Sequence, residues 1–236
     1  MNRALARAVM LLAGCSLLAP AACRAEDPAP PASLITNGGF EDWAALDPGV
    51  AASDGVKNVM LSPPGQAPVG WMPMRELCAD HPQHTGTVAL DEVIHHSGAR
   101  SVRIDNGDMR DITLVQYSTE PFSRQPADPH NIQPSRRYLL RWWVKGQGVE
   151  PSGTGPIMMM FTESEDGGKW ARTDDYERGA LLTGTFDWQP RQFTFITDEH
   201  ARWANFTFQL RWTTGTIWYE DVELLDRGPV VNVETY

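Results

Sequence analysis

The sequence has no apolar run long enough to span a bilayer. Its one extended apolar segment, residues 8–19, is short and follows Arg3 and Arg7, a pattern typical of a secretory signal peptide. We therefore predict that residues 1–25 direct export and are removed near Cys23-Arg24-Ala25. Residues 12–15 also resemble the lipobox of bacterial lipoproteins, with Cys15 as the lipid anchor. The protein is expected to be periplasmic or secreted, or alternatively an outer-membrane lipoprotein.

Cysteine is scarce, which excludes a disulfide-stabilised fold. The chain has three cysteines in 236 residues, and two of them, Cys15 and Cys23, lie in the predicted leader. Only Cys78 remains after conventional cleavage, so the mature protein must be stabilised by its hydrophobic core. About 200 mature residues are enough for one large domain.

Positive charge is also in short supply. The full chain has a net charge of −10, and removal of the leader takes away three arginines and no acid, which gives −13. A chain this acidic is a poor partner for nucleic acid or for an anionic membrane surface.

Long helical periodicity is absent, and short strand-like segments take its place. Residues 26–33 are rich in proline and alanine and predict an extended linker. We expect one folded domain over 34–228 and a C-terminal tail over 229–236. Within the domain, segments rich in β-branched and aromatic residues are separated by Gly, Pro, Asn and Asp, which predicts an all-β sandwich or barrel. The clearest strands are predicted at 101–106, 111–118, 137–145, 156–163, 190–197, 204–212 and 216–225, with long connections at 47–70 and 123–135.

Two of these segments alternate clearly between the two sides of a strand. In 204–212, Phe206, Phe208 and Leu210 share one side, which we expect to pack inward, while Gln209 and Arg211 lie on the other. In 137–145, apolar residues occupy alternate positions and Arg141 and Trp143 share the opposite side. A tryptophan beside an arginine on an outward side suggests a binding surface.

Five segments in order along the chain resemble the jelly-roll carbohydrate-binding modules of the four/nine (CenC-like) type, in the galactose-binding-like superfamily. They are Leu34-Ile-Thr-Asn-Gly-Gly-Phe-Glu41, His96-Ser-Gly-Ala-Arg-Ser-Val-Arg-Ile104, Tyr138-Leu-Leu-Arg-Trp-Trp-Val-Lys145, Thr183–Trp188 with Phe193–Phe195, and Gly215–Leu224. The resemblance implies an antiparallel jelly-roll β-sandwich that binds carbohydrate without cleaving it. It also implies a structural calcium ion where the first and last strands meet, with Glu41 and Asp221 as ligands, and carboxylate oxygens suit Ca²⁺.

Carbohydrate recognition requires flat apolar surfaces for the faces of sugar rings and planar polar side chains for their hydroxyls. The chain has nine tryptophans, of which Trp71, Trp143 and Trp170 are predicted to form stacking platforms. Arg141, Gln209 and Arg211 are predicted as polar partners on the open face of the sheet. Because the chain is acidic, we expect a neutral glycan rather than an acidic one.

A second cluster combines soft and borderline metal ligands. Glu76, Cys78, His81 and His84 lie close together and are followed by His95 and His96, and thiolate and imidazole are ligands for zinc or copper. The spacing matches no established metal motif, and solvent-exposed loop histidines explain the pattern better than a metal site does.

Two other functions remain open at this stage. A small polysaccharide-degrading enzyme on the same scaffold could use carboxylates for hydrolysis or a Tyr or His base with an arginine for a lyase reaction. The candidates are Asp91/Glu92, Glu163/Glu165/Asp166 and Asp174/Asp175 for the first, and Tyr117, Tyr176, His95 and Arg172 for the second. The third reading is an envelope domain that binds another protein, since one fold can serve many ligands.

Overall fold

The computed structural model contains only β-strands as regular elements among the residues it describes. These residues are 31–46, 60–75, 86–108, 112–117, 132–151, 156–164, 170–174, 182–197, 199, 201–210 and 212–230, and they belong to one unit that spans 31–236. No helix in this described part is long and apolar enough to cross a membrane.

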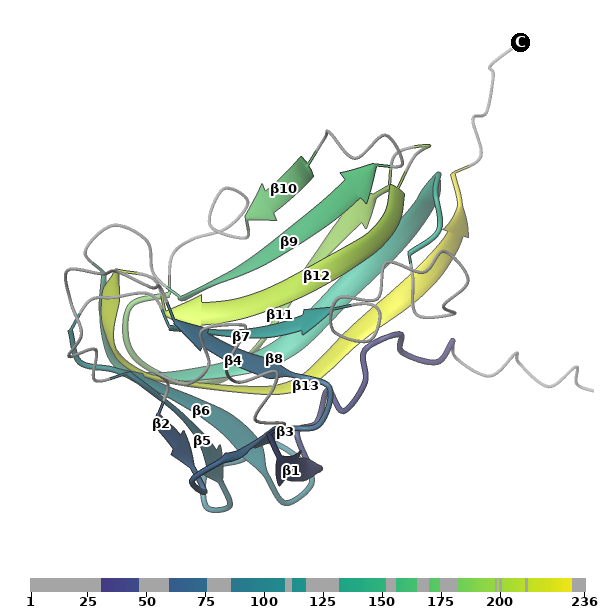
Figure 1. Ribbon diagram of the computed structural model, residues 1–236. Helices are drawn as coiled ribbons and strands as arrows, with labels where there is room; N and C mark the ends of the chain where they lie inside the picture. Colours follow the sequence, from purple (N-terminus) through teal and green to yellow (C-terminus); the bar gives the residue numbers. More distant parts are fainter. Residues whose placement is uncertain are drawn as a thin grey trace, which may run out of the picture. The chain divides into compact units, whose positions relative to one another are not determined.

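Six strands form the larger of the two main sheets (Figure 1), in the order β11-β8-β13-β6-β5-β2. They span Met60–Ser62 (β2), Thr87–Asp91 (β5), Ser101–Asn106 (β6), Arg136–Pro151 (β8), Gly184–Ile196 (β11) and Thr213–Pro229 (β13). The longest pairing, between β8 and β13, is antiparallel and extends for most of the length of both strands. The short edge strand β2 pairs with β5 in parallel, which departs from the otherwise antiparallel arrangement.

Five strands form the second main sheet, in the order β10-β9-β12-β7-β4, and all of its pairs are antiparallel. They span Met72–Arg75 (β4), Ile112–Tyr117 (β7), Pro156–Ser164 (β9), Trp170–Asp174 (β10) and Ala201–Leu210 (β12). A small separate ladder joins Trp43–Ala45 (β1) to Gln66–Pro68 (β3).

Aromatic side chains join the inner faces of the two main sheets. Phe208 on β12 packs edge-on against Tyr219 on β13 and Trp142 on β8, with ring centroids 4.9 Å and 5.9 Å apart. The predicted alternation is confirmed, because Tyr138, Leu140, Trp142, Val144, Phe206, Phe208 and Leu210 are all buried in one core. The expectation of an all-β sandwich is therefore confirmed.

The strand predictions were right in kind but not in extent. Each of the seven predicted segments contains a strand, yet β8, β11 and β13 extend well beyond their predicted limits. The long connection predicted at 47–70 contains the short strands β2 and β3 in its described part. Residues 47–59 and 118–131 lie outside the described residues.

Candidate functional site

A bulge in β13 places the consecutive carboxylates of Glu220 and Asp221 beside the loop that connects β5 to β6. The pairing of β13 with β8 shifts register between Glu220 and Glu223, and Asp221 adopts a left-handed backbone conformation with φ of 51°. Aspartate tolerates this region better than most residues. Strand alternation alone would send Glu220 and Asp221 to opposite faces, but a bulge redirects side chains locally. Both therefore contact His96 and Ser97.

Glu220 is the buried anchor of this arrangement. Its side chain has no exposed surface, and its carboxylate accepts hydrogen bonds from the backbone N–H groups of His96 and Ser97, each at 2.5 Å. The Ser97 hydroxyl lies 3.0 Å from Glu220 Oε1 and 2.8 Å from Asp221 Oδ1, so its single proton is shared between the two carboxylates. Burial raises the pKa of the Glu220 carboxyl, and these hydrogen bonds offset part of that rise.

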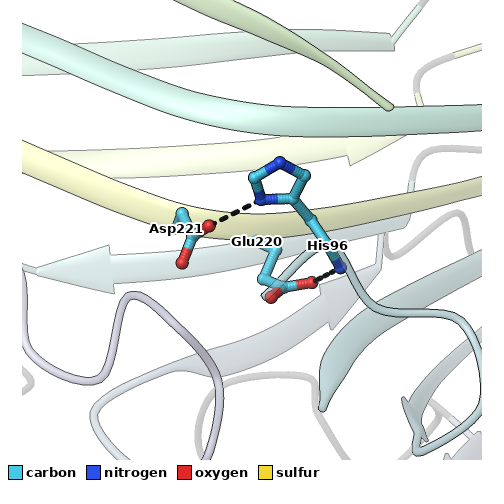
Figure 2. Close-up of side chains that lie close together, drawn as sticks. All are labelled: His96, Glu220 and Asp221. Atoms are coloured by element: carbon cyan, nitrogen blue, oxygen red, sulfur yellow. Dashed lines mark hydrogen bonds and ion pairs between the residues drawn. The ribbon is translucent and has the colours of Figure 1, made fainter. Parts of the chain in front are cut away.

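Asp221 fixes the imidazole of His96 (Figure 2). The Nδ1 atom of His96 lies 2.9 Å from Asp221 Oδ2, and the Ser97 hydroxyl donates to Asp221 Oδ1 at 2.8 Å. Because a carboxylate can only accept, the His96 proton in this pair belongs on Nδ1. The carboxylate of Asp221 thus holds the imidazole ring in one orientation, and the carboxylate of Glu220 holds the backbone of His96.

Glu41 holds the other end of the same turn. Its Oε1 atom accepts from the backbone N–H groups of Ala99 at 2.9 Å and Arg100 at 3.3 Å. Gly98, between the two anchoring points, has φ of 54°, and a Cβ atom there would lie 2.0 Å from Glu41 Oε1. Glycine suits this position, because its φ is positive and a side chain here would displace the Glu41 carboxylate from its hydrogen bonds.

The turn presents His96 to two tryptophans of the six-stranded sheet. The imidazole stacks on the indole of Trp143 in β8, with ring centroids 3.7 Å apart and planes 19° apart. It also lies 5.8 Å from the ring of Trp188 in β11, at 60°. Two partly exposed indoles from neighbouring strands are thus joined through one histidine.

An open pocket of about 720 Å³ lies beside Trp143 on the outer face of the six-stranded sheet, the side turned away from the five-stranded sheet. Arg141 contributes a guanidinium that is hydrogen-bonded to the carboxylate of Glu223, which raises the pKa of Arg141. Among the described residues, the lining comes from β8, β11 and β13 and comprises Arg141, Trp142, Trp143, Pro190, Arg191, Gln192, Asp221 and Glu223.

The structure brings together two of the six residues predicted to bind ligand. Arg141 and Trp143 both line the pocket, two positions apart on β8. Trp170 begins β10 opposite Glu163, in a ladder row that Trp203 of β12 continues, but its side chain lies outside the described residues. Arg211 lies wholly outside them.

Trp71 and Gln209 are placed in the interior, which corrects the expectation that they face a ligand. Trp71 is 4% exposed, donates from Nε1 to the Thr36 carbonyl at 3.1 Å, and packs against Phe40 and Phe208. Gln209 is 2% exposed. Strand parity placed Gln209 correctly on the side of β12 opposite Phe208, but that side is covered at this position.

Glu41 and Asp221, the implied calcium ligands, both contact the turn that contains His96, but their carboxylate oxygens do not belong to one cluster of possible metal ligands. Within the described residues, His96, Glu220 and Asp221 are the acidic and histidine side chains whose ligand atoms lie within 4.8 Å of one another. Glu41 is not among them, and its Oε1 atom already faces two backbone N–H groups. The residues as placed therefore do not assemble the implied Glu41–Asp221 pair around one ion, and calcium stays a prediction.

Of the remaining catalytic candidates, Asp91, Glu92 and His95 are described, and His95 is exposed. Asp91 is buried and accepts from Val93, Ile94 and Trp218, whereas Glu92 pairs with Arg100 at 3.3 Å; they do not act together as a catalytic pair. Residues outside the description, in whole or for their side chains, are Cys78, His81, His84, Tyr117, Glu163, Glu165, Asp166, Arg172, Asp174, Asp175 and Tyr176.

Sequence reasoning missed the role of His96, which is the centre of the aromatic group. The sequence marks it only as a histidine that follows the cluster around Cys78 and as the first residue of a segment that leads into a core strand. The one signal that could have found it is the acidic pair Glu220-Asp221 inside a predicted strand, since two adjacent acids there are compatible with a bulge.

The fold and the site define a β-sandwich with an aromatic pocket on the outer face of one sheet. No model of a known protein family matches the sequence, and no curated protein matches it. Among solved structures, CBM4 is 16% identical, with 82% of this chain and 99% of that chain covered and a TM-score of 0.49. TmCBM61 in complex with β-1,4-galactotriose is 13% identical, with 83% and 99% covered and a TM-score of 0.45.

A third similar structure is the enzymatically active domain of tailspike protein 4 from Bacteriophage CBA120. It is 11% identical, with 82% of this chain covered and a TM-score of 0.49, and the match spans only 21% of the tailspike chain. All three TM-scores are below 0.5, so neither a ligand nor an activity is transferred from these structures.

Proposed function

We propose that this protein binds a neutral poly- or oligosaccharide in the pocket beside Trp143. The observation that carries the proposal is the combination of a half-buried indole with planar polar side chains in one open pocket. An indole face stacks on the C–H face of a pyranose ring, as aromatic surfaces do with flat apolar partners. The guanidinium, amide and carboxylate groups of Arg141, Gln192 and Glu223 can exchange paired hydrogen bonds with ring hydroxyls.

The charge balance of the pocket favours a neutral ligand. Arg141 is paired with Glu223, so the positive charge of this guanidinium at the pocket is already compensated by its neighbour. Compensated side chains can still bind hydroxyl groups, whereas a ligand carboxylate would compete with Glu223 for Arg141. The net charge of −10 also disfavours an acidic polysaccharide.

The pocket supports binding in preference to cleavage. Of the residues that the structure describes, two carboxylates line the pocket, Asp221 and Glu223, and both hold other side chains of the protein through hydrogen bonds. A hydrolase needs one carboxyl group free to protonate the leaving group and another free to attack or to activate water. We therefore infer a non-catalytic module with an affinity in the micromolar to millimolar range, as expected for shallow stacking and hydroxyl contacts that compete with water.

A glycan array on the purified protein, followed by calorimetry with the best ligand, tests the proposal. Trp143→Ala should weaken binding at least about tenfold, because the stacking surface is lost. Arg141→Gln serves as a second pocket variant that leaves the indole in place. Trp212→Phe is the matched control, since Trp212 is 42% exposed and does not line the pocket.

The results separate the competing functions. Reducing ends or unsaturated products released from the bound glycan would replace binding with an enzymatic function. Equal affinity of the wild type, Trp143→Ala and Arg141→Gln would show that the glycan binds elsewhere. If no glycan, neutral or acidic, binds to the folded protein, the carbohydrate proposal is wrong.

A further inference from the structure

The indole of Trp143 can offer only one face to a ligand. His96 stacks on the other face at 3.7 Å, close enough to exclude a sugar ring from that side. Trp143 lines the pocket, and His96 is not among the lining residues. The histidine therefore lies behind the indole with respect to the pocket.

The histidine is itself held more firmly than an ordinary loop residue. Its backbone N–H donates to the buried carboxylate of Glu220, and its Nδ1 atom is bonded to Asp221. Both carboxylates come from the bulge of β13, a central strand of the sheet. The turn is thus fastened to the same sheet that carries Trp143 in β8. Figure 2 shows the contacts of His96 with Glu220 and Asp221.

We propose that His96 is a positioning residue that fixes the orientation of the Trp143 indole before the ligand arrives. This inference rests on the proposed function, because it concerns the same pocket. A side chain that is already ordered loses less conformational entropy on binding, so affinity rises without any new contact to the ligand. His96 acts through Trp143 and need not touch the glycan.

Two substitutions separate the stacking contact from the hydrogen bond. His96→Asn keeps a side-chain N–H donor for Asp221 but removes the ring, whereas His96→Phe keeps a ring for Trp143 but removes the donor. His95→Asn is the matched control, because His95 is the adjacent exposed histidine and undergoes the same chemical change.

We expect His96→Asn to weaken glycan binding by about three- to tenfold, the range typical of one aromatic pair. His96→Phe should stay within about twofold of the wild type, and His95→Asn should not differ from it. An independent readout is the indole N–H signal of Trp143 in NMR spectra, assigned by its absence from Trp143→Phe. Its chemical shift should change in His96→Asn and remain near the wild-type position in His96→Phe.

The outcomes distinguish this inference from the proposed function. If Trp143→Ala loses binding while His96→Asn binds normally, the positioning role is wrong and the pocket assignment stands. If Trp143→Ala binds like the wild type, the pocket assignment fails first. If His96→Asn and His96→Phe lose affinity and thermal stability in parallel, His96 supports the fold as a whole, and the positioning role is again overturned.

Discussion

Asp91 shows how a single buried carboxylate can hold a loop on the sheet. Its Oδ1 atom accepts from the backbone N–H groups of Val93 and Ile94, both at 2.9 Å, and its Oδ2 atom accepts from Trp218 Nε1 at 2.8 Å. Burial alone would raise the pKa of Asp91, but these hydrogen bonds and the nearby Arg103 lower it overall. Asp91 thereby anchors the start of the segment that ends in the His96 turn.

Asp91→Asn should destabilise the protein by about 1–3 kcal/mol at pH 7, because an amide nitrogen would face the Trp218 N–H and leave two donors opposed. The folded-state pKa of Asp91 is depressed, so its stabilising contribution is present above the unfolded-state value, about pH 4. That contribution is lost as the pH falls through the folded-state value. Urea unfolding should therefore show a smaller difference in the free energy of unfolding between the wild type and Asp91→Asn at pH 3 than at pH 7.

The control for this prediction is Asp187→Asn, which changes an exposed carboxylate paired with Lys145. It should leave the unfolding midpoint unchanged within error, since exposed pairs contribute little. An Asp91→Asn protein that unfolds at the wild-type urea concentration at pH 7 would contradict the anchoring role.

Residue-level prediction from the sequence succeeded where alternation alone determines placement. The side of β8 that carries Leu140 and Trp142 is buried and the side that carries Arg141 and Trp143 lines the pocket, as period-two alternation requires. Trp71 was misplaced because it precedes the short strand β4, where no periodic pattern exists to assign a side.

At the scale of elements, the sequence predicted the long strands and missed the short ones. β6 was predicted at its exact limits, because its apolar residues alternate between clear breaks. β1, β2 and β3 have three residues each, which is too few for a periodic signal. Bulges also escape such reasoning, because they are set by the pairing partner and not by local composition.

Gly215 marks one such irregularity, where the register between β13 and β8 shifts between Thr214 and Thr216. Its φ is 118°, and a Cβ atom there would lie 2.7 Å from the backbone oxygen of Gly148. Gly215→Ala should therefore cost at least about 3 kcal/mol, since both the backbone conformation and the contact are unfavourable.

Gly148→Ala is the matched control in the partner strand. Gly148 also has a positive φ, 59°, but a Cβ atom there meets nothing within 4 Å. Gly148→Ala should destabilise the protein by only about 1 kcal/mol, because the positive φ is its one unfavourable feature. If chemical denaturation gives the same loss of unfolding free energy for Gly215→Ala and Gly148→Ala, the close approach of β13 to Gly148 does not contribute to the effect of Gly215→Ala.

At the scale of the whole molecule, the candidate site could not have been assembled from the sequence. Trp143, His96 and Asp221 are far apart along the chain, and they meet because β8 and β13 are neighbours and a turn folds back over them. The sequence supplied the residue types and the outward position of Arg141 and Trp143. The pairing order of strands, the bulge and the placement of the turn depend on long-range contacts that single-sequence periodicity does not encode.

The balance of charge over the molecule leads to a final prediction. If the ligand is neutral and the pocket charges are paired within the protein, the dissociation constant should change less than about twofold between 50 and 500 mM NaCl, because screening acts mainly on unpaired charges. Calorimetry at the two salt concentrations measures this directly. An affinity that falls steeply with salt would instead indicate an anionic ligand at Arg141 or Arg191. That result would retain the pocket and replace the neutral glycan with an acidic one, against the repulsion expected from a net charge of −10.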